Sequence, residues 1–229
     1  MKKVFFPIFA VTIMMMAAFT SCDDKEDNKL TPAEEQKEAV VAALEKNSDL
    51  SEFSVGLSAL NFANIETDKL TVFAVKNSGM SKSALKATGD DVNMLRQIVK
   101  GNYSKSSLTD GLQLTALDGT TLTITVMGGR VYINGVELGD EISAGSSVAY
   151  IVEQGFPATA NTAQYSITVR ECNASWTPEN KTPYLTASGA SISLRDSLGR
   201  AIGPYATGAD GKLSVTLVKG FYAYKITKG

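Results

Sequence analysis

The spacing of hydrophobic and polar residues predicts a helical stretch followed by strands. Thr31 and Glu34 have the spacing of a capping box, and Pro32 occupies the first helical position. We therefore expect a helix from residue 31 to about 46. A second helix is predicted to begin at Asp49 or Ser51, and its apolar face would hold Leu50, Phe53, Leu57 and Leu60.

Two further segments follow these helices. Leu70 to Val75 is a short apolar run that predicts a strand. A third helix is expected to open at Asp90 or Asp91, because Leu95, Ile98 and Val99 then form an apolar stripe at helical spacing. We interpret the faces of all three helices as core.

From residue 112 the hydrophobic period changes to two. Asp118-Gly119, Gly128-Gly129 and Asn134-Gly135 each separate two alternating runs, which is the pattern of β-hairpin turns. Residues 147–152 form the last strand of this series. Helices followed by a meander of short strands are typical of the α+β class.

The chain after residue 157 has a different composition. Residues 158–163 are small and polar, and we interpret them as a linker. Alternating runs at 165–169, 191–194, 213–217 and 221–226 predict four or five strands, fewer than the roughly seven of an immunoglobulin-like sandwich. One sheet edge would then lack a neighbour. We expect a strand from the first part of the chain to cover that edge, and the alternative is pairing with a partner chain.

The N-terminus has the pattern of an export signal. Lys2 and Lys3 precede an apolar run from Val4 to Ala18, which is short for a membrane-spanning helix. Ser21 and Cys22 follow, and this ending resembles the bacterial lipobox. The resemblance implies a signal peptide over 1–21, lipidation of Cys22 and a membrane anchor; the alternative is an ordinary signal peptide with an incidental cysteine. Residues 22–30 would be an acidic tether, either a surface-export signal or a polar spacer.

The composition excludes several classes of chemistry. The chain has no histidine, which excludes histidine triads, histidine bases and histidine-ligated metals. Without Lys2 and Lys3, 20 basic and 24 acidic residues remain, the net charge changes from −2 to −4, and no basic stretch predicts nucleic-acid binding. Cys172 would have no disulfide partner if Cys22 carries lipid. We predict no enzyme, no catalytic or metal-ligating residue and no cofactor.

Five segments in order resemble motifs of the fasciclin-like domain family, over about residues 33–157. They are Thr71 to Ala74 with Asn77, Leu95 to Tyr103, Leu114 to Gly119, Val131 to Gly135, and Val148 to Glu153 ending at Pro157. The resemblance implies a β-wedge with packed helices and a role in cell adhesion. Arg96 and Gln97 replace the family's Tyr-His pair, which puts that specific adhesive contact in doubt.

The last segment, 164–229, resembles small immunoglobulin-like sandwiches of the carboxypeptidase-regulatory and collagen-binding B-repeat type. The resemblance lies in the turn at Thr207 to Lys212 and in the alternating Gly220 to Ile226. The predicted organisation is therefore a signal at 1–21, a tether at 22–30, a fasciclin-like domain at 31–157, a linker at 158–163 and a sandwich at 164–229.

These observations lead to two hypotheses of function. The first is a lipid-anchored protein on the bacterial outer membrane that acts in adhesion or protein–protein interaction, with Arg96, Gln97, Tyr103 and Trp176 as candidate contact residues. The second is a glycan-binding lipoprotein of a nutrient-uptake system, which a groove of exposed aromatics would favour. Trp176, Tyr184 and Tyr205 are its candidate platform, although core packing or loop anchoring is the favoured explanation of these residues. A hydrolase would need a pocket with paired carboxylates.

Overall fold

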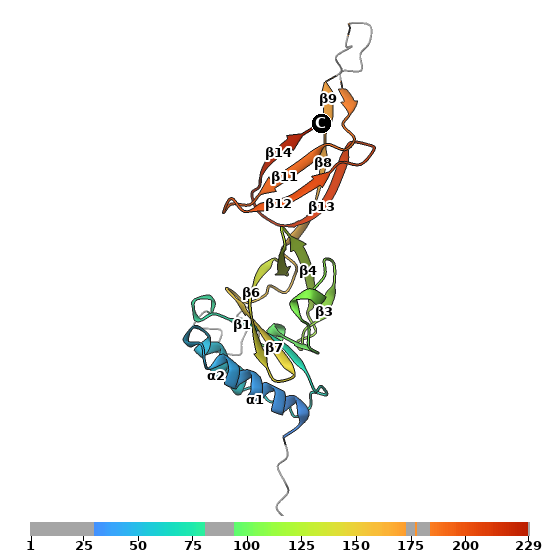
Figure 1. The fold of residues 1–229 in the computed structure, drawn as a ribbon. Helices are drawn as coiled ribbons and strands as arrows, with labels where there is room; N and C mark the ends of the chain where they lie inside the picture. Colours follow the sequence, from blue (N-terminus) through green and yellow to red (C-terminus); the bar gives the residue numbers. More distant parts are fainter. Residues whose placement is uncertain (1–29, 81–93, 173–176, 178–183, 229) are drawn as a thin grey trace, which may run out of the picture.

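The computed structural model describes residues 30–80, 94–172, 177 and 184–228. Two units follow one another along its length, and Figure 1 shows the helices at one end and strand β9 (Arg170–Cys172) towards the other. The first two predicted helices are confirmed as α1 (Pro32–Leu44) and α2 (Ser51–Ser58). The capping box is present, because Thr31 Oγ1 accepts from the backbone N–H of Glu34 at 3.3 Å and Glu34 Oε2 accepts from that of Thr31 at 3.2 Å.

The remaining helical turns are short. They are the 3₁₀ helices η1 (Ser48–Leu50), η2 (Asn77–Gly79), η3 (Met94–Gln97) and η4 (Lys105–Ser107). Among the described residues, no helix has both the length and the apolar character that a membrane crossing requires.

The first unit is built on a seven-stranded sheet in the order β2-β1-β7-β6-β5-β4-β3. Its strands are β1 (Leu70–Val75), β2 (Ile98–Lys100), β3 (Gln113–Thr115), β4 (Thr121–Met127), β5 (Arg130–Ile133), β6 (Val136–Ala144) and β7 (Ser147–Val152). β1 runs parallel to β7, and the other neighbouring pairs are antiparallel.

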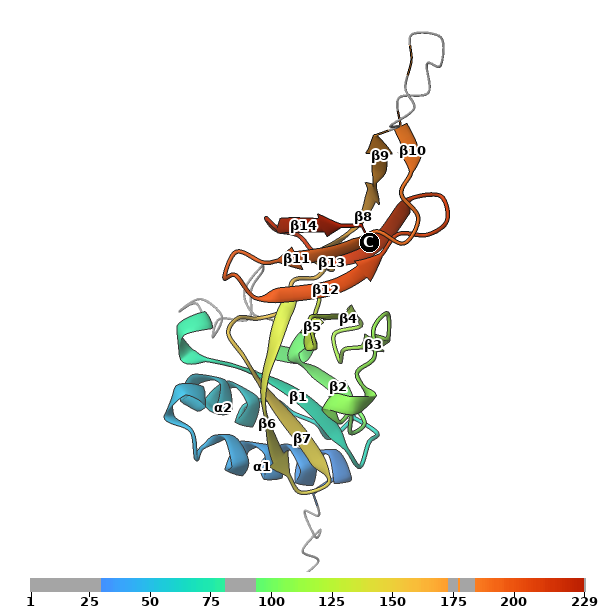
Figure 2. The same cartoon turned by 45° about the horizontal axis from the view of Figure 1, so that its top comes forward.

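This sheet curls until its two end strands nearly meet. Val99 of β2 forms an isolated bridge with Ala116, directly after β3, and the backbone N–H of Leu117 donates to Ile98 O at 2.9 Å. The result is nearly a closed barrel, with α1 packed against β1, β6 and β7 and α2 packed against α1 and β1 (Figure 2). The α+β class is confirmed.

The third predicted helix is wrong in its described part. Met94 to Gln97 form only a 3₁₀ turn, and Ile98 and Val99 belong to strand β2. Ile98 pairs with Val72 and Val99 with Thr71, so both residues are part of the sheet. β-Branched side chains suit this pairing better than a helix interior. Asp90 and Asp91, the predicted start, lie outside the described residues.

The predicted hairpin turns of the first unit are all present. The β3–β4, β4–β5 and β5–β6 connections fall at Asp118-Gly119, Gly128-Gly129 and Asn134-Gly135. Asn134 (φ 47°) and Gly135 (φ 91°) both have positive φ, as a tight hairpin turn requires.

The described part of the second unit already has seven strands, so the predicted four or five is wrong. They are β8 (Thr162–Thr168), β9 (Arg170–Cys172), β10 (Tyr184–Thr186), β11 (Ser191–Arg195), β12 (Ala201–Ala206), β13 (Lys212–Val218) and β14 (Ala223–Thr227). They form the sheets β12-β11-β14, β13-β8 and β10-β9. The missed strands are β9, β10 and β12, which are short or contain Gly203-Pro204, and therefore lack an alternating apolar signal.

The expected cover of the open edge is also absent from the described residues. β14 pairs with β11 alone, and no strand of the first unit reaches its outer side. The first unit contacts the sandwich elsewhere, where β4 packs against β13.

The β4–β5 hairpin joins the two units. Met127 and Tyr132, at the two ends of this turn, are buried in the core of the second unit. At Gly128 an added Cβ would lie 2.4 Å from Ala201 O, so only glycine permits this approach to β12.

The backbone of the connection at 158–163 is hydrogen-bonded to both units. β8 already begins at Thr162, and Asn161 N donates to Asn134 O at 2.9 Å while Asn161 O accepts from the backbone N–H of Lys219 at 3.0 Å. The backbone of this segment therefore holds the first unit against the second.

Candidate binding groove of the second unit

Arg96 lies in a structural network of the first unit. Its Nε donates to Asp118 Oδ2 at 3.0 Å and to Thr120 Oγ1 at 3.3 Å, and its Nη1 donates to Phe156 O at 3.4 Å. The guanidinium thus connects η3 to the β3–β4 turn and to the end of the unit. A partner would have to compete with these contacts to use its charge.

The two other described candidate residues are also held inside the first unit. Gln97 is fully buried, and its amide atoms have no hydrogen-bond partner in the described part of the chain. Tyr103 is half-buried, its backbone N–H donates to Thr71 Oγ1 at 2.9 Å, and its carbonyl accepts from Tyr150 at 2.9 Å. The structure brings Arg96, Gln97 and Tyr103 into one unit but makes no open site from them.

Of the three residues of the predicted platform, the structure describes Tyr184 and Tyr205. Cys22 and Trp176 lie outside the described residues. Tyr184 is exposed on β10, whereas Tyr205, on β12, is partly buried and packs against the core of the second unit. The structure therefore shows Tyr205 as a packing residue.

A groove of about 490 Å³ opens between the β12-β11-β14 sheet and the β13-β8 sheet of the second unit, beside β8 and β14. Its volume is in the range of ligand sites. Its apolar and aromatic lining consists of Tyr165, Ile167, Ile192, Leu194, Leu217, Phe221, Tyr222 and Tyr224.

The groove is open because β14 is uncovered on its groove-side face, which would be internal in a closed sandwich. Ile192 pairs with Ile226 and Leu194 with Tyr224, so each pair shares one face of the sheet. Ile192 and Leu194 are buried, but Tyr224 is 72 % exposed and Ile226 38 %. Phe221, just before β14, is 92 % exposed. The alternation of β14 therefore offers apolar side chains that nothing described covers.

Two tyrosines form one wall of the groove. The rings of Tyr165 and Tyr222 meet edge to face, with centroids 6.2 Å apart. The Tyr222 hydroxyl donates to Val218 O. Burial raises the pKa of Tyr222, so its hydroxyl stays protonated at neutral pH and the wall remains uncharged.

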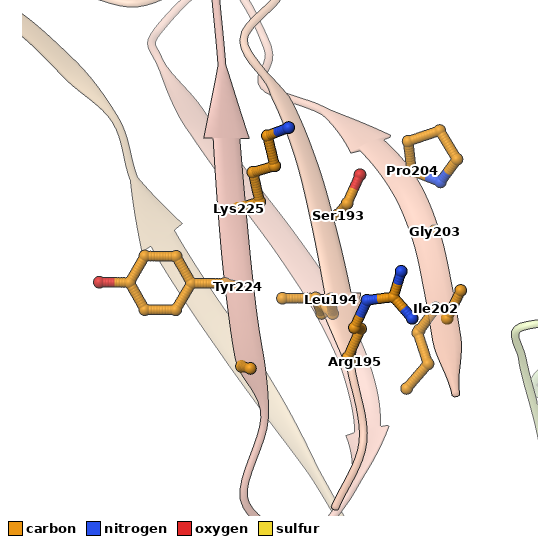
Figure 3. A pocket seen from close by; sticks show the side chains of 10 residues that line it. Ser193, Leu194, Arg195, Ile202, Gly203, Pro204, Tyr224 and Lys225 are labelled. Atoms are coloured by element: carbon orange, nitrogen blue, oxygen red, sulfur yellow. The ribbon is translucent and has the colours of Figure 1, made fainter. Parts of the chain in front are cut away.

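A smaller hollow of about 350 Å³ lies over the outer face of the β12-β11-β14 sheet. Figure 3 shows Lys225, Ser193 and Arg195 around it, with the Tyr224 ring directed away from β11 past the free edge. Arg195 Nη1 donates to Gly199 O at 2.7 Å, but neither Arg195 nor Lys225 makes an ion pair with a described residue. No acidic side chain lines the hollow, so it is positively charged.

A cluster of charges fixes the second unit to the first. Arg200 contacts Glu137 Oε2 and Asp196 Oδ2, each at 2.7 Å, and Arg130 lies 3.7 Å from both acids. Burial would raise the pKa of Asp196, but hydrogen bonds from the Arg200 backbone and side chain outweigh it and hold that pKa below its ordinary value. Glu137 belongs to β6, so this cluster holds the sandwich in place on the first unit.

The groove and the hollow offer two surfaces for binding. Among the described residues, no three Cys, Asp or Glu side chains gather as metal ligands. The groove is lined by aliphatic, aromatic and small polar side chains. What these surfaces can do is bury an apolar partner on one face and attract an anionic group on the other.

The comparison with known proteins adds no family. No family model matches the chain, and no curated protein sequence matches it.

The groove was not identified from the sequence, although one signal was present. Phe221 to Ile226 carries three aromatic residues in an alternating run at the end of the second unit. The register of β14 against β11, which assigns each side chain to a face, was needed to locate the groove.

Proposed function

We propose that this protein is lipid-anchored at Cys22 on the outer membrane of a bacterial cell and binds an extracellular partner through its second unit. The first unit, which resembles a fasciclin-like domain, acts as a rigid support for the second unit. The process served is adhesion or protein–protein interaction at the cell surface.

One observation carries the location of the binding face. Six of the eight large hydrophobic residues exposed in the described part of the chain lie in the second unit. They are Tyr184, Leu185, Leu198, Phe221, Tyr224 and Ile226. Exposed apolar side chains that are concentrated in one unit make that unit the candidate for an interaction site. Among the described residues of the first unit, only Leu30 and Val55 are exposed in this way.

The anchor is tested by changing the two cysteines separately. Cys22→Ser should move the protein from the detergent phase to the aqueous phase, because the acyl chains supply the membrane affinity. Cys172→Ser is the control and should partition as the wild type does. Equal partitioning of Cys22→Ser and the wild type would contradict lipidation.

The exposure of the binding unit is tested on intact cells. Antibodies against the second unit should label the cells and reduce their attachment to matrix proteins, and antibodies against α1 should label without blocking. Blocking by the α1 antibodies alone would place the adhesive surface on the first unit.

A second function is favoured by the aromatic lining of the groove. Tyr165, Phe221, Tyr222 and Tyr224 could stack on sugar rings, as a glycan-binding protein requires. Screening the protein on a glycan array separates the two functions. Tyr224→Ser should abolish any glycan signal from the groove, whereas Tyr184→Ser, on β10, should leave that signal unchanged.

A further inference from the structure

The free edge of β14 is unusually suited to accept another strand. β14 pairs with β11 through five consecutive residues without a bulge. The opposite edge, β12, contains Gly203-Pro204, and its pairing with β11 shifts register between Ile192 and Leu194. Proline and bulges are devices that protect sheet edges from further pairing. The fold therefore protects one edge of this sheet and leaves the other regular.

The backbone of this edge is available for pairing. Within the described residues, no hydrogen bond connects residues 223–227 to a backbone group outside the strands of their own sheet. An edge strand presents a row of unpaired N–H and C=O groups at its outer side. Five residues offer a pairing length of about 16 Å.

The two faces beside this edge differ in chemistry. On the groove side, Tyr224 and Ile226 alternate and are exposed. On the other side, Lys225 stands beside Arg195, and neither is neutralised by a described carboxylate. A strand laid against β14 would point alternate side chains to these two faces.

We propose that the free edge of β14 binds an extended segment of a partner protein by strand addition, and that this segment alternates apolar and acidic residues. This inference rests on the proposed function, because it names the partner of the same binding face. The apolar side chains extend the groove-side face beyond Tyr224 and Ile226. The acidic side chains approach Lys225 and Arg195, and backbone hydrogen bonds to β14 supply affinity.

Charge separates this partner from a second copy of the chain. In an antiparallel β14–β14 pair centred on the strand, the two Lys225 side chains would face each other, and like charges directly opposite destabilise a sheet pair. The positive hollow instead attracts an anionic segment. The regular backbone edge also favours a peptide over a glycan, because a sugar leaves the strand's N–H and C=O groups unpaired.

The test uses the full-length protein in lipid nanodiscs and three capped seven-residue peptides. The first alternates Ile and Glu, the second replaces each Glu by Lys, and the third has the composition of the first with its isoleucines contiguous. Fluorescence anisotropy measures binding, and amide hydrogen exchange measures protection of residues 223–227. The alternating Ile–Glu peptide should bind and protect those amides, and the other two should not.

A charge reversal and its matched control complete the test. Lys225→Glu should weaken binding of the Ile–Glu peptide about tenfold and create binding of the Ile–Lys peptide, because one attraction becomes a repulsion. Lys212→Glu makes the same charge change on β13 in the other sheet and should alter neither affinity. The gain of the Ile–Lys peptide cannot result from a misfolded variant.

Four results would overturn the inference. They are absence of binding by the Ile–Glu peptide, binding without protection of 223–227, equal binding of the contiguous peptide, and a dimer in which β14 is protected without peptide. Binding of a neutral oligosaccharide in place of the peptide would likewise assign the groove to glycans. None of these results affects membrane anchoring or antibody blocking, so failure of this inference is distinguishable from failure of the proposed function.

Discussion

The two units of this chain bury apolar side chains to very different extents. Among the residues that the structure describes, the core cluster of the first unit contains 31 buried hydrophobic residues, and that of the second contains 6. Two of those six, Met127 and Tyr132, come from the β4–β5 hairpin of the first unit. The first unit is thus closed around its own core, whereas the core of the second unit includes side chains of the first.

The difference has a topological cause. The first sheet curls until β2 and β3 nearly meet, which removes most of its open edge. The second unit divides its strands among three small sheets and leaves β14 without an outer neighbour. A sandwich that is thin on one side loses core area there but gains an exposed strand. The same feature therefore lowers stability and offers a binding surface.

The largest effect should come from separating the units. Fragment 30–157 should unfold cooperatively, because its core cluster is complete. Fragment 158–229 should show no cooperative transition, because it lacks Met127 and Tyr132. Circular dichroism during urea titration measures both. A cooperative transition in the isolated second fragment would show that its own four buried core residues suffice.

A core truncation in the first unit should have the next largest effect. Phe73 is fully buried. The centroid of its ring lies 5.0 Å from that of the Phe156 ring and 6.0 Å from that of the Tyr150 ring. Phe73→Ala should reduce the free energy of unfolding of this unit by about 3–5 kcal/mol. Val55→Ala, at an exposed position of α2, is the control and should change it by less than about 0.5 kcal/mol.

The corresponding truncation in the second unit should cost less. Ile192 is fully buried at the floor of the open groove. Ile192→Ala should lower the unfolding free energy of the second unit by about 2–3 kcal/mol, because its neighbours can relax into the groove. Hydrogen exchange of β11 and β1 resolves the two units. A loss that appears equally in β1 would mean that the units unfold as one.

The charged contact between the units should contribute a smaller amount. Arg200→Met keeps the aliphatic stem but removes the contacts to Glu137 and Asp196, and should cost about 1 kcal/mol. Arg195→Met is the matched control, since Arg195 makes no ion pair with a described residue. Denaturant titration measures the unfolding free energies of both variants. Equal values would mean that the charge cluster contributes nothing to stability.

The same cluster predicts a dependence on pH. The pKa of Asp196 is lower in the folded protein than its ordinary value of 3.8. Its contribution to stability is therefore full above pH 3.8 and is lost as the pH falls through the depressed folded value. The wild type should lose stability in that acid range more than Asp196→Asn does. Parallel pH profiles of the two proteins would contradict this assignment.

Local patterns predicted the elements of the first unit well. The capping box at Thr31 and the turn at Asn134-Gly135 act through neighbours in sequence, so their consequences could be inferred directly. Residues 98–100 were assigned to a helix because a three-residue strand is too short for its period to show. Their pairing with β1, almost 30 residues earlier, decides the outcome.

The candidate site depended on relations that sequence patterns do not contain. The alternation at 221–226 predicted a strand correctly, but its open side follows from which strands neighbour β11. Arg96 and Gln97 were singled out by resemblance to a motif, yet the structure ties one into a hydrogen-bond network and buries the other. Burial of a polar residue depends on tertiary packing, which a motif alone does not specify.

The smallest effect on stability should come from the exposed side chain that most distinguishes the second unit. Phe221 is 92 % exposed, so Phe221→Ser removes almost no buried area and should change the unfolding free energy by less than about 0.5 kcal/mol. If the side chain serves binding, the same variant should reduce attachment to matrix proteins and binding of a dye for exposed apolar surface. Val55→Ser, also exposed but on the first unit, should reduce neither. A large loss of stability in Phe221→Ser would mean that the ring covers the core after all, and the groove would then be closed in solution.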